Sequence, residues 1–363
     1  MICRHFGVCG GCATQDLAYA DELRRKEARL AELFGRPVEV RPSPREFHYR
    51  TRMDYVFAFK KLGLRKKGDA KGVIHLEECL LISPRAWKAV QAVHESAVRH
   101  EIDSYSFVSH KGYLRYVVVR EAPASGELMI VLLTASRDPK IRAVLDDLEP
   151  HVDAAAWTFT DREADVSFGE VVEVRKRGWI EEVIGGKRFR FGPNSFFQGN
   201  PWQTEALYRH VAERAEGRVT DLFCGVGGFS MFAASRATEI VGIDNNAEAI
   251  ELARHNAAAN GVTNARFFVG DSGRFAEEMK TDTLILDPPR AGLGPKFVRK
   301  VVRAAPKRIL YISCNPRSLA EELPQFEGYR VEDLRGFDLF PKTTHVETVA
   351  ILAVNQGGSV TPS

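Results

Sequence analysis

Two short motifs near the carboxyl end of the chain carry side chains that can do chemistry. The motif SCNPRS follows an apolar run of β-type residues, Arg308–Ile312, and the motif DPPR follows a second run, Leu284–Leu286. Proline cannot continue the hydrogen-bond ladder of a strand, so each motif predicts a strand end with a reactive side chain just beyond it. Because ligands of parallel sheets bind at the carboxyl ends of strands, we expect the Cys314 thiol and the Asp287 carboxylate to face one crevice.

A glycine-rich turn earlier in the chain predicts a nucleotide site. The segment DLFCGVGGFS begins as a strand at Asp221, breaks at Gly225 and continues as a helix. Glycine lets the backbone approach a ligand, and the helix start supplies free amides. Asp244, nineteen residues after Gly225, ends the next strand, where a carboxylate can accept two ribose hydroxyls. Turn and acid also fit a dinucleotide, but the GVGG spacing and the DPPR strand end argue against NAD.

The elements that position these motifs alternate between helix and strand from about Pro201 onward. Helices fit between most of the strand candidates, which predicts an α/β fold with a largely parallel, doubly wound sheet. A loop alone joins the last two candidates, so we expect an antiparallel hairpin at one edge of the sheet. The candidates are Val219–Phe223, Glu239–Ile243, Ala265–Val269, Thr283–Leu286, Arg308–Ile312, Tyr329–Leu334 and Glu347–Val354.

The first half of the chain predicts a smaller α+β domain. Its expected elements are helices over Gln15–Phe34 and Ser83–His100, a hairpin over Phe47–Arg65 with its turn at Lys61–Gly63, and paired strands over Tyr113–Val119 and Leu128–Thr134. A chain of 363 residues exceeds one typical domain. We expect two domains, over residues 1–190 and 191–355, and a disordered tail over 356–363.

The charge of the chain is unevenly divided. Residues 1–100 hold 19 Lys and Arg against 12 Asp and Glu, a balance of +7, and the rest holds 32 against 36, a balance of −4. This asymmetry indicates a polyanion as partner of the first half, although a solvated basic face fits the charge nearly as well. With no apolar run of about 18 residues and no signal peptide, the sequence predicts a soluble, cytoplasmic protein with no membrane partner, and we expect a monomer.

Four cysteines have the spacing of metal ligands. Cys3, Cys9 and Cys12 form the pattern CxxxxxCGGC, and Cys79 lies sixty-seven residues further on. Three close thiols and one distant thiol suit a tetrahedral zinc ion or an iron–sulfur cluster, and the spacing alone does not separate the two. Disulfides are the weaker interpretation for a chain without a secretory signal. The spacing also differs from CxxxCxxC, so radical chemistry is not indicated.

Five motifs, in this order along nearly the whole chain, resemble those of the RNA uracil-5-methyltransferases, which make 5-methyluridine in ribosomal and transfer RNA. They are NSFFQGN, DLFCGVGGFS, LDPPRAGL, YISCNPRSL and FPKTTHVETV. The resemblance implies a Rossmann-like S-adenosylmethionine-dependent methyltransferase domain preceded by an α+β iron–sulfur and RNA-binding domain. Some members carry a [4Fe–4S] cluster on this cysteine arrangement, so the resemblance favours that cluster over zinc.

The resemblance also implies roles for individual residues. Cys314 is the expected nucleophile and Glu347 the expected base, while Asp287 and Arg290 are expected to bind the uracil. Two positions depart from the commoner pattern: Gly228 stands where asparagine is usual, and Asp244 where glutamate is frequent. Contacts with the methyl donor or the target base are expected from Gln198, Phe223, Gly225, Gly228, Asp244, Asp271 and Asp287.

Two of these positions, and one cysteine beside them, also have a plainer interpretation. Asp271 can simply cap the helix that follows it, and Glu347 can be an edge-strand carboxylate. Cys224, beside the glycine turn, is best explained as a small buried thiol. The case for Cys314 is stronger, because carbon 5 of uracil is a poor nucleophile until a thiolate adds to carbon 6. A base must then remove the carbon 5 proton, and the uridine must leave its stack to reach the site.

A basic, aromatic segment of the first half predicts the RNA contact. Arg45–Lys71 holds nine Lys and Arg against three acids, interleaved with aromatic residues. The expected RNA-binding residues are Tyr49, Arg50, Arg52, Arg65, Lys66 and Lys67. The cysteine cluster favours 23S rRNA over tRNA as the target, since well-known tRNA members of the family often lack it. Two other hypotheses remain: an iron–sulfur RNA-binding protein with a vestigial methyltransferase half, and methylation of an exocyclic amine.

Overall fold

The computed structural model describes residues 2–355 of the chain, and the predicted tail lies outside them. The chain forms two compact units. Unit 1 comprises the residues up to 18 together with 45–183 and 190–194, and unit 2 comprises 19–44, 184–189 and the residues from 195 onward. This division differs from the predicted single boundary at residue 190, because a segment near the amino terminus packs in the second unit.

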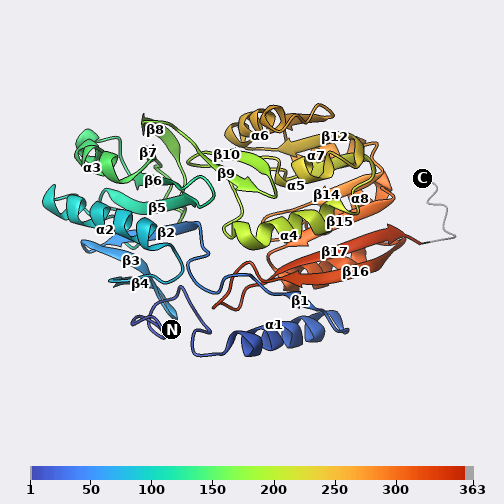
Figure 1. The fold of residues 1–363 in the computed structure, drawn as a ribbon, viewed down its shortest axis with the longest axis horizontal. Coiled ribbons are helices and arrows are strands. Elements are labelled where there is room, and N and C mark those ends of the chain that lie inside the picture. Colours follow the sequence, from blue (N-terminus) through green and yellow to red (C-terminus); the bar gives the residue numbers. More distant parts are fainter. Residues whose placement is uncertain (1, 356–363) are drawn as a thin grey trace. The chain divides into compact units, whose positions relative to one another are not determined.

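Unit 1 is built on a seven-stranded sheet (Figure 1). The strand order is β4-β3-β2-β5-β6-β7-β8, and all neighbours are antiparallel except the parallel pair β6 and β7. Helices α2 and α3 pack their apolar residues on one face of this sheet. The elements are β2 (Arg52–Ala58), β3 (Lys61–Lys66), β4 (Asp69–His75), α2 (Pro84–Arg99), β5 (Leu114–Ala122), β6 (Glu127–Thr134), α3 (Arg142–Leu148), β7 (Ala154–Phe159) and β8 (Glu170–Arg175).

The hairpin of β2 and β3 turns two residues earlier than predicted. Ala58 pairs with Lys61, so the turn consists of Phe59 and Lys60, with φ values of +53° and +54°. Residues other than glycine, asparagine and aspartate rarely adopt this left-handed conformation, and the sequence therefore carries no ordinary signal for a turn here. Helix α2 begins as predicted, with the Ser83 hydroxyl oxygen accepting a hydrogen bond from the Ala86 N–H.

Unit 2 contains an eight-stranded, mostly parallel sheet. Its order is β1-β16-β17-β15-β14-β11-β12-β13, and only β17 runs antiparallel to its neighbours β15 and β16. The seven predicted strands are all present. They are β11 (Gly217–Leu222), β12 (Ala237–Asp244), β13 (Ala265–Val269), β14 (Thr283–Leu286), β15 (Arg308–Ser313), β16 (Tyr329–Phe337) and β17 (Glu347–Val354).

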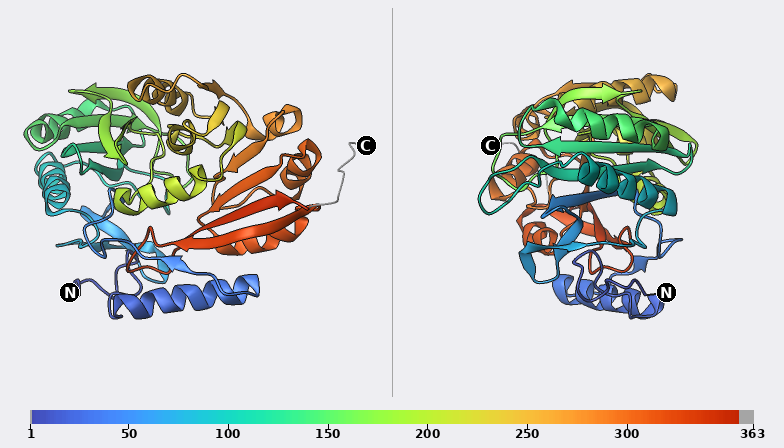
Figure 2. Two further views of the ribbon diagram at one scale, coloured as in Figure 1. Left: turned by 45° about the vertical axis from the view of Figure 1, so that its right-hand side comes forward. Right: turned by 90° about the vertical axis from the view of Figure 1, so that its left-hand side faces the viewer.

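Helices cover both faces of this sheet, as Figure 2 shows. Helices α1, α7, α8 and α9 share one apolar core with the central strands. Helices α4 and α5 pack against each other, and α6 packs on β12 and β13. The helices are α1 (Tyr19–Phe34), α4 (Pro201–Ala212), α5 (Gly228–Ala233), α6 (Ala247–Ala259), α7 (Ser272–Glu278), α8 (Pro295–Ala304) and α9 (Pro316–Glu322).

Two elements from the start of the chain belong to unit 2. Strand β1 (Val40–Arg41) pairs in parallel with the end of β16 and forms the edge of the sheet. The predicted edge hairpin is therefore covered by a further strand. Leu30 of α1 is fully buried in the core of unit 2. The remaining strands, β9 (Ile180–Ile184) and β10 (Lys187–Phe191), form a two-stranded sheet of their own.

No helix in the described part of the chain is long and apolar enough to span a membrane.

Candidate active site

The glycine-rich turn follows β11, and Asp244 of the neighbouring strand β12 holds it. The Asp244 carboxylate accepts hydrogen bonds from the backbone N–H of Gly225 (3.0 Å) and of Asn246 (2.8 Å). Gly225 and Gly227 have φ values of +52° and +84°, a conformation that glycine adopts without steric cost. The acid and the turn that the sequence predicts are thus in direct contact.

Asp221, the last but one residue of β11, has a buried carboxylate oxygen without a partner. Its Oδ2 accepts a hydrogen bond from the Ser230 hydroxyl (2.6 Å), but its Oδ1 has no partner among the described residues. Burial, reinforced by the charge of Asp244, raises the pKa of Asp221 to about 7. A buried unpartnered oxygen is costly unless a ligand satisfies it. The ammonium group of an S-adenosylmethionine molecule fits this requirement.

Gly228 stands where the family resemblance predicts asparagine, and the structure supplies a reason. A Cβ atom at this position would lie 2.3 Å from the Tyr208 hydroxyl oxygen. The Tyr208 ring is held in place by Phe229 and Phe232, with centroid distances of 4.8 and 5.2 Å. Tyr208 therefore occupies the space that an asparagine side chain would need, and only glycine fits beside it.

We expect Gly228→Asn to destabilise the protein through this clash, by about 1–3 kcal/mol, the usual cost of overpacking. In a Tyr208→Leu background the same substitution should cost clearly less, because the obstructing hydroxyl is gone. Urea unfolding of the wild type, the two single variants and the double variant measures the coupling. Additive effects, within about 0.5 kcal/mol, would contradict this explanation.

Cys314 and Glu347 meet at the end of one antiparallel ladder. The ladder between β15 and β17 ends at the pair Ser313 and Thr348. Cys314 and Glu347 are the next residues beyond it, near enough for the charge of Glu347 to act on the thiol. Cys314 is half-buried, and the Glu347 side chain is only 3% exposed. Asp287 follows β14, the strand on the other side of β15. The two motifs and the final strand are thus brought to one edge, as the sequence predicts.

Burial and neighbouring negative charge raise the pKa of the acidic groups at this edge. Burial raises the pKa of Cys314 to about 11, and the charges of Glu347 and Asp287 add to the effect. The guanidinium of Arg290 acts in the opposite direction. Burial, followed by the charge of Asp221, raises the pKa of Asp287 to about 7. Burial and Asp287 together raise the pKa of Glu347 well above its usual range. In the ligand-free protein the thiol is therefore protonated at neutral pH.

We expect iodoacetamide to alkylate Cys314 slowly at neutral pH, because only the thiolate reacts. A pKa of about 11 instead of 9.0 leaves about a hundredfold less thiolate than in an ordinary cysteine. The rate should rise about tenfold per pH unit from pH 7 to 10. Mass spectrometry of the Cys314 peptide measures the alkylation rate, and N-acetylcysteine serves as the reference thiol. A rate that levels off below pH 9 would show that the thiol is not held in its neutral form.

Two side chains hold the loops that carry these groups. The Asn315 side-chain amide donates a hydrogen bond to the Arg290 carbonyl (3.1 Å), which links the SCNPRS and DPPR motifs. The buried Glu322 carboxylate accepts hydrogen bonds from the backbone N–H of Leu293 and Gly294, both at 2.8 Å. Sequence reasoning missed Glu322, and its only local signal is a carboxylate on an otherwise ordinary short helix.

The remaining candidates for donor binding lie in different settings. Gln198 is buried in the segment before α4. Phe223 has a φ of +64°, and its ring stacks on Phe297 at a centroid distance of 5.7 Å. Asp271 is the N-cap of α7, where its carboxylate accepts a hydrogen bond from the Arg274 N–H (3.0 Å). The capping role that the sequence left open for Asp271 is thus observed.

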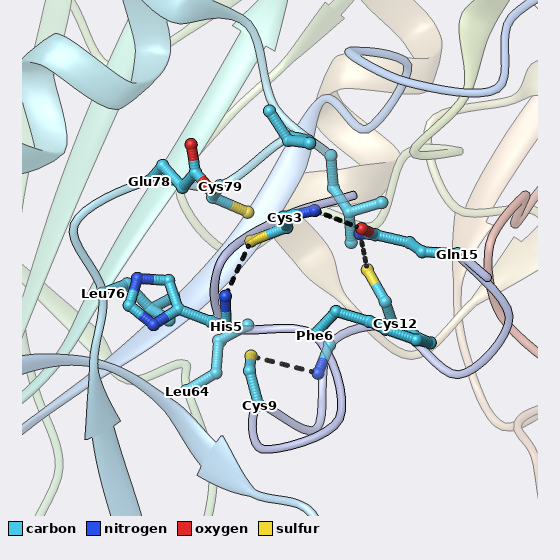
Figure 3. Close-up of a pocket in the computed structure, with 13 residues that line it drawn as sticks. Cys3, His5, Phe6, Cys9, Cys12, Gln15, Leu64, Leu76, Glu78 and Cys79 are labelled. Carbon is cyan, nitrogen blue, oxygen red and sulfur yellow. Dashed lines mark hydrogen bonds between the residues drawn. The ribbon is translucent and has the colours of Figure 1, made fainter. Parts of the chain in front are cut away.

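The four cysteines of unit 1 line one pocket (Figure 3). Backbone N–H groups point at two of the sulfur atoms: that of His5 at Cys3 (3.5 Å) and that of Gly11 at Cys9 (3.3 Å). The Cys12 sulfur accepts a hydrogen bond from the Gln15 side-chain amide (3.0 Å). The distant Cys79 is therefore brought to the other three, as its spacing predicts, and all four are free thiols.

Thiols and leucines make up much of the lining of this pocket. Among residues 2–355, no group of three or more His, Cys, Asp or Glu side chains is arranged to hold a metal ion. The thiols instead surround a space lined by leucines, with N–H donors aimed at sulfur. Hydrogen bonds to sulfur and an apolar surrounding are the features with which proteins hold and tune iron–sulfur clusters. The donor set, four thiols, fits that group.

The predicted RNA-binding residues differ in their availability. The Tyr49 ring is fully buried, so it has no face on which a base could stack, and this part of the prediction is wrong. Arg50 and Arg52 are half-buried, and Arg52 pairs with Asp54 at 3.0 Å. The second group is more accessible: Lys66 and Lys67 are exposed, and Arg65 stacks on Phe107 with 4.5 Å between its Cζ and the ring centroid.

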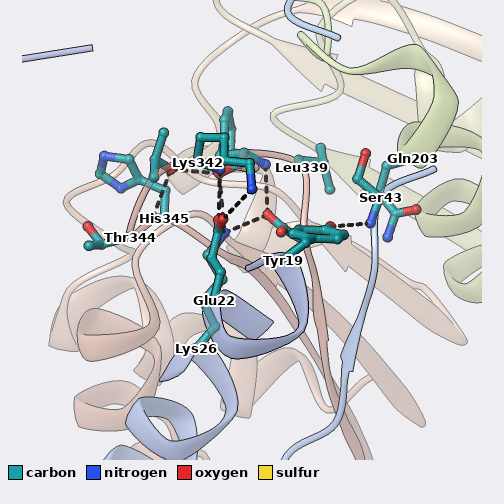
Figure 4. A network of polar contacts seen from close by, with 12 residues as sticks. Tyr19, Glu22, Lys26, Ser43, Gln203, Leu339, Lys342, Thr344 and His345 are labelled. Carbon is teal, nitrogen blue, oxygen red and sulfur yellow. Dashed lines mark hydrogen bonds and ion pairs between the residues drawn. The ribbon is translucent and has the colours of Figure 1, made fainter. Parts of the chain in front are cut away.

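A buried ion-pair network in unit 2 joins α1 to the loop after β16 (Figure 4). The Lys26 ammonium donates hydrogen bonds to Glu22 and Asp338, both at 2.8 Å. Its third hydrogen bond goes to the Phe340 carbonyl (3.2 Å). Glu22 also accepts a hydrogen bond from the Lys342 backbone N–H (2.7 Å). Because these side chains are almost fully buried, the loop that leads to β17 is fixed by charges from the start of the chain.

Comparison with known proteins agrees with this site. A family model described as tRNA (Uracil-5-)-methyltransferase matches residues 272–355, and one described as Methyltransferase small domain matches residues 201–310. The tRNA (uracil(54)-C(5))-methyltransferases of Pyrococcus furiosus and Pyrococcus horikoshii are 36% and 38% identical to this chain. These alignments cover 96% and 97% of this chain, and 84% and 85% of the relatives.

A solved structure is similar over the same extent. The crystal structure of Pyrococcus abyssi tRNA (uracil-54, C5)-methyltransferase in complex with S-adenosyl-L-homocysteine superposes with a TM-score of 0.81 at 33% identity, covering 96% of this chain and 86% of that one. Fold and site therefore define an S-adenosylmethionine-dependent methyltransferase. The chain belongs to the RNA uracil-5-methyltransferase family, whose enzymes place a methyl group on carbon 5 of uracil in RNA.

Proposed function

We propose that this enzyme methylates carbon 5 of a uridine in tRNA, at position 54. The observation that carries this proposal is the likeness over nearly the full length of both chains to Pyrococcus enzymes named for that nucleotide. This replaces 23S rRNA, which the sequence analysis favoured because of the cysteine cluster. The cysteine cluster is one local feature of the chain, whereas the likeness extends over both units.

Incubation with unmodified transcripts tests the choice of substrate. The purified enzyme, S-adenosylmethionine and either a tRNA transcript or 23S rRNA should give 5-methyluridine in the tRNA only. Nuclease digestion and mass spectrometry then locate the modified nucleotide. A tRNA in which uridine 54 is replaced by cytidine is the matched control and should stay unmethylated. Methylation of the 23S rRNA alone would overturn the proposal, and methylation of an exocyclic amine would appear as a different nucleoside.

We propose further that Cys314 is the nucleophile and Glu347 the base. The thiol loses its proton to water, and the resulting thiolate forms a bond to carbon 6 of the uracil. The electron pair of the double bond between carbons 5 and 6 moves towards carbon 5 and the carbonyl oxygen at carbon 4. Bound S-adenosylmethionine supplies the methyl group that carbon 5 receives.

Release of the product requires the second residue. The Glu347 carboxylate takes the proton from carbon 5, the electrons of that bond restore the double bond, and the bond between carbon 6 and Cys314 breaks. The ladder register, which makes the two residues neighbours, supports this division of roles. Arg290 favours the thiolate and the charge that develops on the uracil oxygens, and Asp287 is placed to accept a hydrogen bond from the uracil amide.

The residues that would hold S-adenosylmethionine surround the turn after β11. Asp221 has the free oxygen for the ammonium group. Asp244 ends the neighbouring strand β12, where a carboxylate can accept ribose hydroxyls, and it also holds the turn through the Gly225 N–H. We assign Gln198 and Phe223 to the same group on the family resemblance. One carboxylate oxygen of Asp271 caps α7, so the contact with the adenine falls to its other oxygen.

We propose that Cys3, Cys9, Cys12 and Cys79 hold a [4Fe–4S] cluster in unit 1. The shared pocket and the N–H groups aimed at sulfur support this. Anaerobic purification followed by iron, sulfide and zinc analysis and an absorption spectrum tests it. We expect four irons per chain in the wild type and loss of iron in Cys79→Ser. Cys224→Ser is the matched control, because Cys224 is a free cysteine of unit 2, outside the four of this pocket. Zinc without iron would overturn the proposal.

A further inference from the structure

The most exposed large apolar side chain among the described residues is Phe59, at the tip of the β2–β3 hairpin. It is 77% exposed. A phenylalanine ring exposed to water contributes no hydrophobic free energy to folding. Phe59 also occupies a left-handed turn position that suits glycine or asparagine better. Both features are unfavourable for folding alone. Unfavourable residues that persist in a structure are found mainly at functional sites.

The tip that carries Phe59 is held firmly from both sides. The backbone N–H of Lys60 donates a hydrogen bond to the Ser104 hydroxyl (2.7 Å). The Lys60 carbonyl lies 2.9 Å from the His94 ring nitrogen Nε2, within hydrogen-bond distance. The unusual turn is therefore a defined conformation, and it presents the Phe59 ring at a fixed place.

Phe59 forms one wall of a pocket in unit 1. The exposed Val108 and its neighbour Phe107 also line this pocket. Phe107 is fixed by the Arg65 guanidinium on one side and by the Tyr105 ring at 5.0 Å. The full lining is Ala58, Phe59, Arg65, Lys71, Tyr105, Ser106, Phe107, Val108, Glu163 and Asp165.

The charges around this pocket match a nucleic acid. Five exposed lysines, none in an ion pair with a described residue, lie on the tip, along β3, on the turn after it and in β4: Lys60, Lys61, Lys66, Lys67 and Lys71. The pocket itself is nearly neutral, because Arg65 and Lys71 offset Glu163 and Asp165, and Arg65 pairs with Asp165 at 3.0 Å. A cationic rim around a neutral, aromatic interior suits a phosphate backbone with one base turned inward.

We propose that this pocket binds one unpaired base of the RNA substrate, stacked on Phe59, while the surrounding lysines bind the adjoining phosphates. The inference rests on the proposed function only in that the partner is RNA. It adds a nucleotide subsite in unit 1, apart from the methylated uridine. The exposed carboxylate of Glu163, which lines the pocket, would accept a hydrogen bond from the edge of the base.

Binding of an unmodified tRNA transcript, measured by fluorescence anisotropy without S-adenosylmethionine, tests the subsite. Phe59→Leu and Phe59→Gly should bind about 5- to 150-fold more weakly, the usual effect of losing one base–aromatic stack, and Phe59→Trp should bind like the wild type. Phe59→Gly should at the same time melt at an unchanged or higher temperature, because glycine suits the left-handed turn. If Phe59 serves only the stability of the fold, Phe59→Gly should melt at a lower temperature and bind RNA with unchanged affinity. This result would overturn the proposal.

The salt dependence separates stacking from charge. Phe59→Gly should leave the slope of log K against log salt concentration unchanged, whereas Lys60→Gln with Lys61→Gln should make it shallower. A changed slope in Phe59→Gly would overturn the stacking role. If the wild type binds the tRNA transcript but methylates only rRNA, tRNA is not the substrate. The comparison of Phe59 variants still tests the subsite in that case. A wild type that binds neither tRNA nor 23S rRNA would overturn both.

Discussion

Cys314→Ala should abolish methyl transfer while leaving RNA binding unchanged. Removing a covalent nucleophile costs about 10⁴-fold or more in rate, because the remaining groups cannot take over its bond. Cys314 is half-buried, and alanine fits the same space, so the fold and the RNA contact should persist. Transfer of radiolabelled methyl groups to tRNA and a parallel binding assay measure the two effects. Residual activity above about a tenth of the wild type would end the assignment of Cys314 as nucleophile.

Two covalent assays define the roles more sharply. RNA with 5-fluorouridine at the target should remain bound to the wild-type protein, since fluorine cannot leave carbon 5 as a proton does. Glu347→Gln should accumulate the same kind of adduct with ordinary uridine, because no base removes the carbon 5 proton, and its turnover should fall by about 10²- to 10⁴-fold. Cys314→Ala should form neither adduct. An adduct in Cys314→Ala, or rapid turnover in Glu347→Gln, would contradict the mechanism.

Lys26→Met should destabilise the protein by about 3–5 kcal/mol. The substitution removes the cation that Glu22 and Asp338 share; Glu22 keeps the buried Lys342 ammonium at 3.6 Å, but Asp338 stays buried without a cation. Removing one member of a buried ion pair is strongly destabilising. Turnover should fall as well, because the loop after β16 leads to Glu347 and loses its anchor on α1. Urea unfolding and steady-state kinetics give the two readings.

A second substitution on the same helix serves as the control. Arg24 pairs with Asp21 on the solvent side of α1, where both side chains are largely exposed. Arg24→Met should change the free energy of unfolding by no more than about 0.5 kcal/mol, as exposed pairs usually do. If Lys26→Met behaves like Arg24→Met, the buried network is not a structural anchor.

The site residues that lie at the ends of strands could be predicted from the sequence. Cys314 and Asp287 follow apolar runs and are themselves followed by proline, and Asp244 is the last residue of its strand, so their convergence follows from parallel-sheet geometry. The antiparallel position of β17 was predictable from the loop before it. The pairing register that brings Glu347 near Cys314 was not, because register depends on packing along the whole ladder.

Other features could not be predicted because they depend on distant partners. Strand β1 has only two residues and pairs with a strand near the other end of the chain. Tyr49 lies in a basic, aromatic segment that suggests a surface, yet its ring is buried. Phe59 and Lys60 form a left-handed turn, although neither residue type favours that conformation. Contacts from Ser104 and His94 hold this turn. Tertiary contacts overrode the local signals in each case.

The network around Lys26 also has a consequence for biosynthesis. Lys26 leaves the ribosome 312 residues before its partner Asp338. At typical elongation rates of 5–20 residues per second, the α1 segment waits roughly 15–60 s for the strand it must join. Its apolar and charged side chains stay undocked throughout that interval. We expect the nascent chain to depend on chaperones until its last strands emerge, and a gene cut at the predicted boundary to yield a methyltransferase half that aggregates.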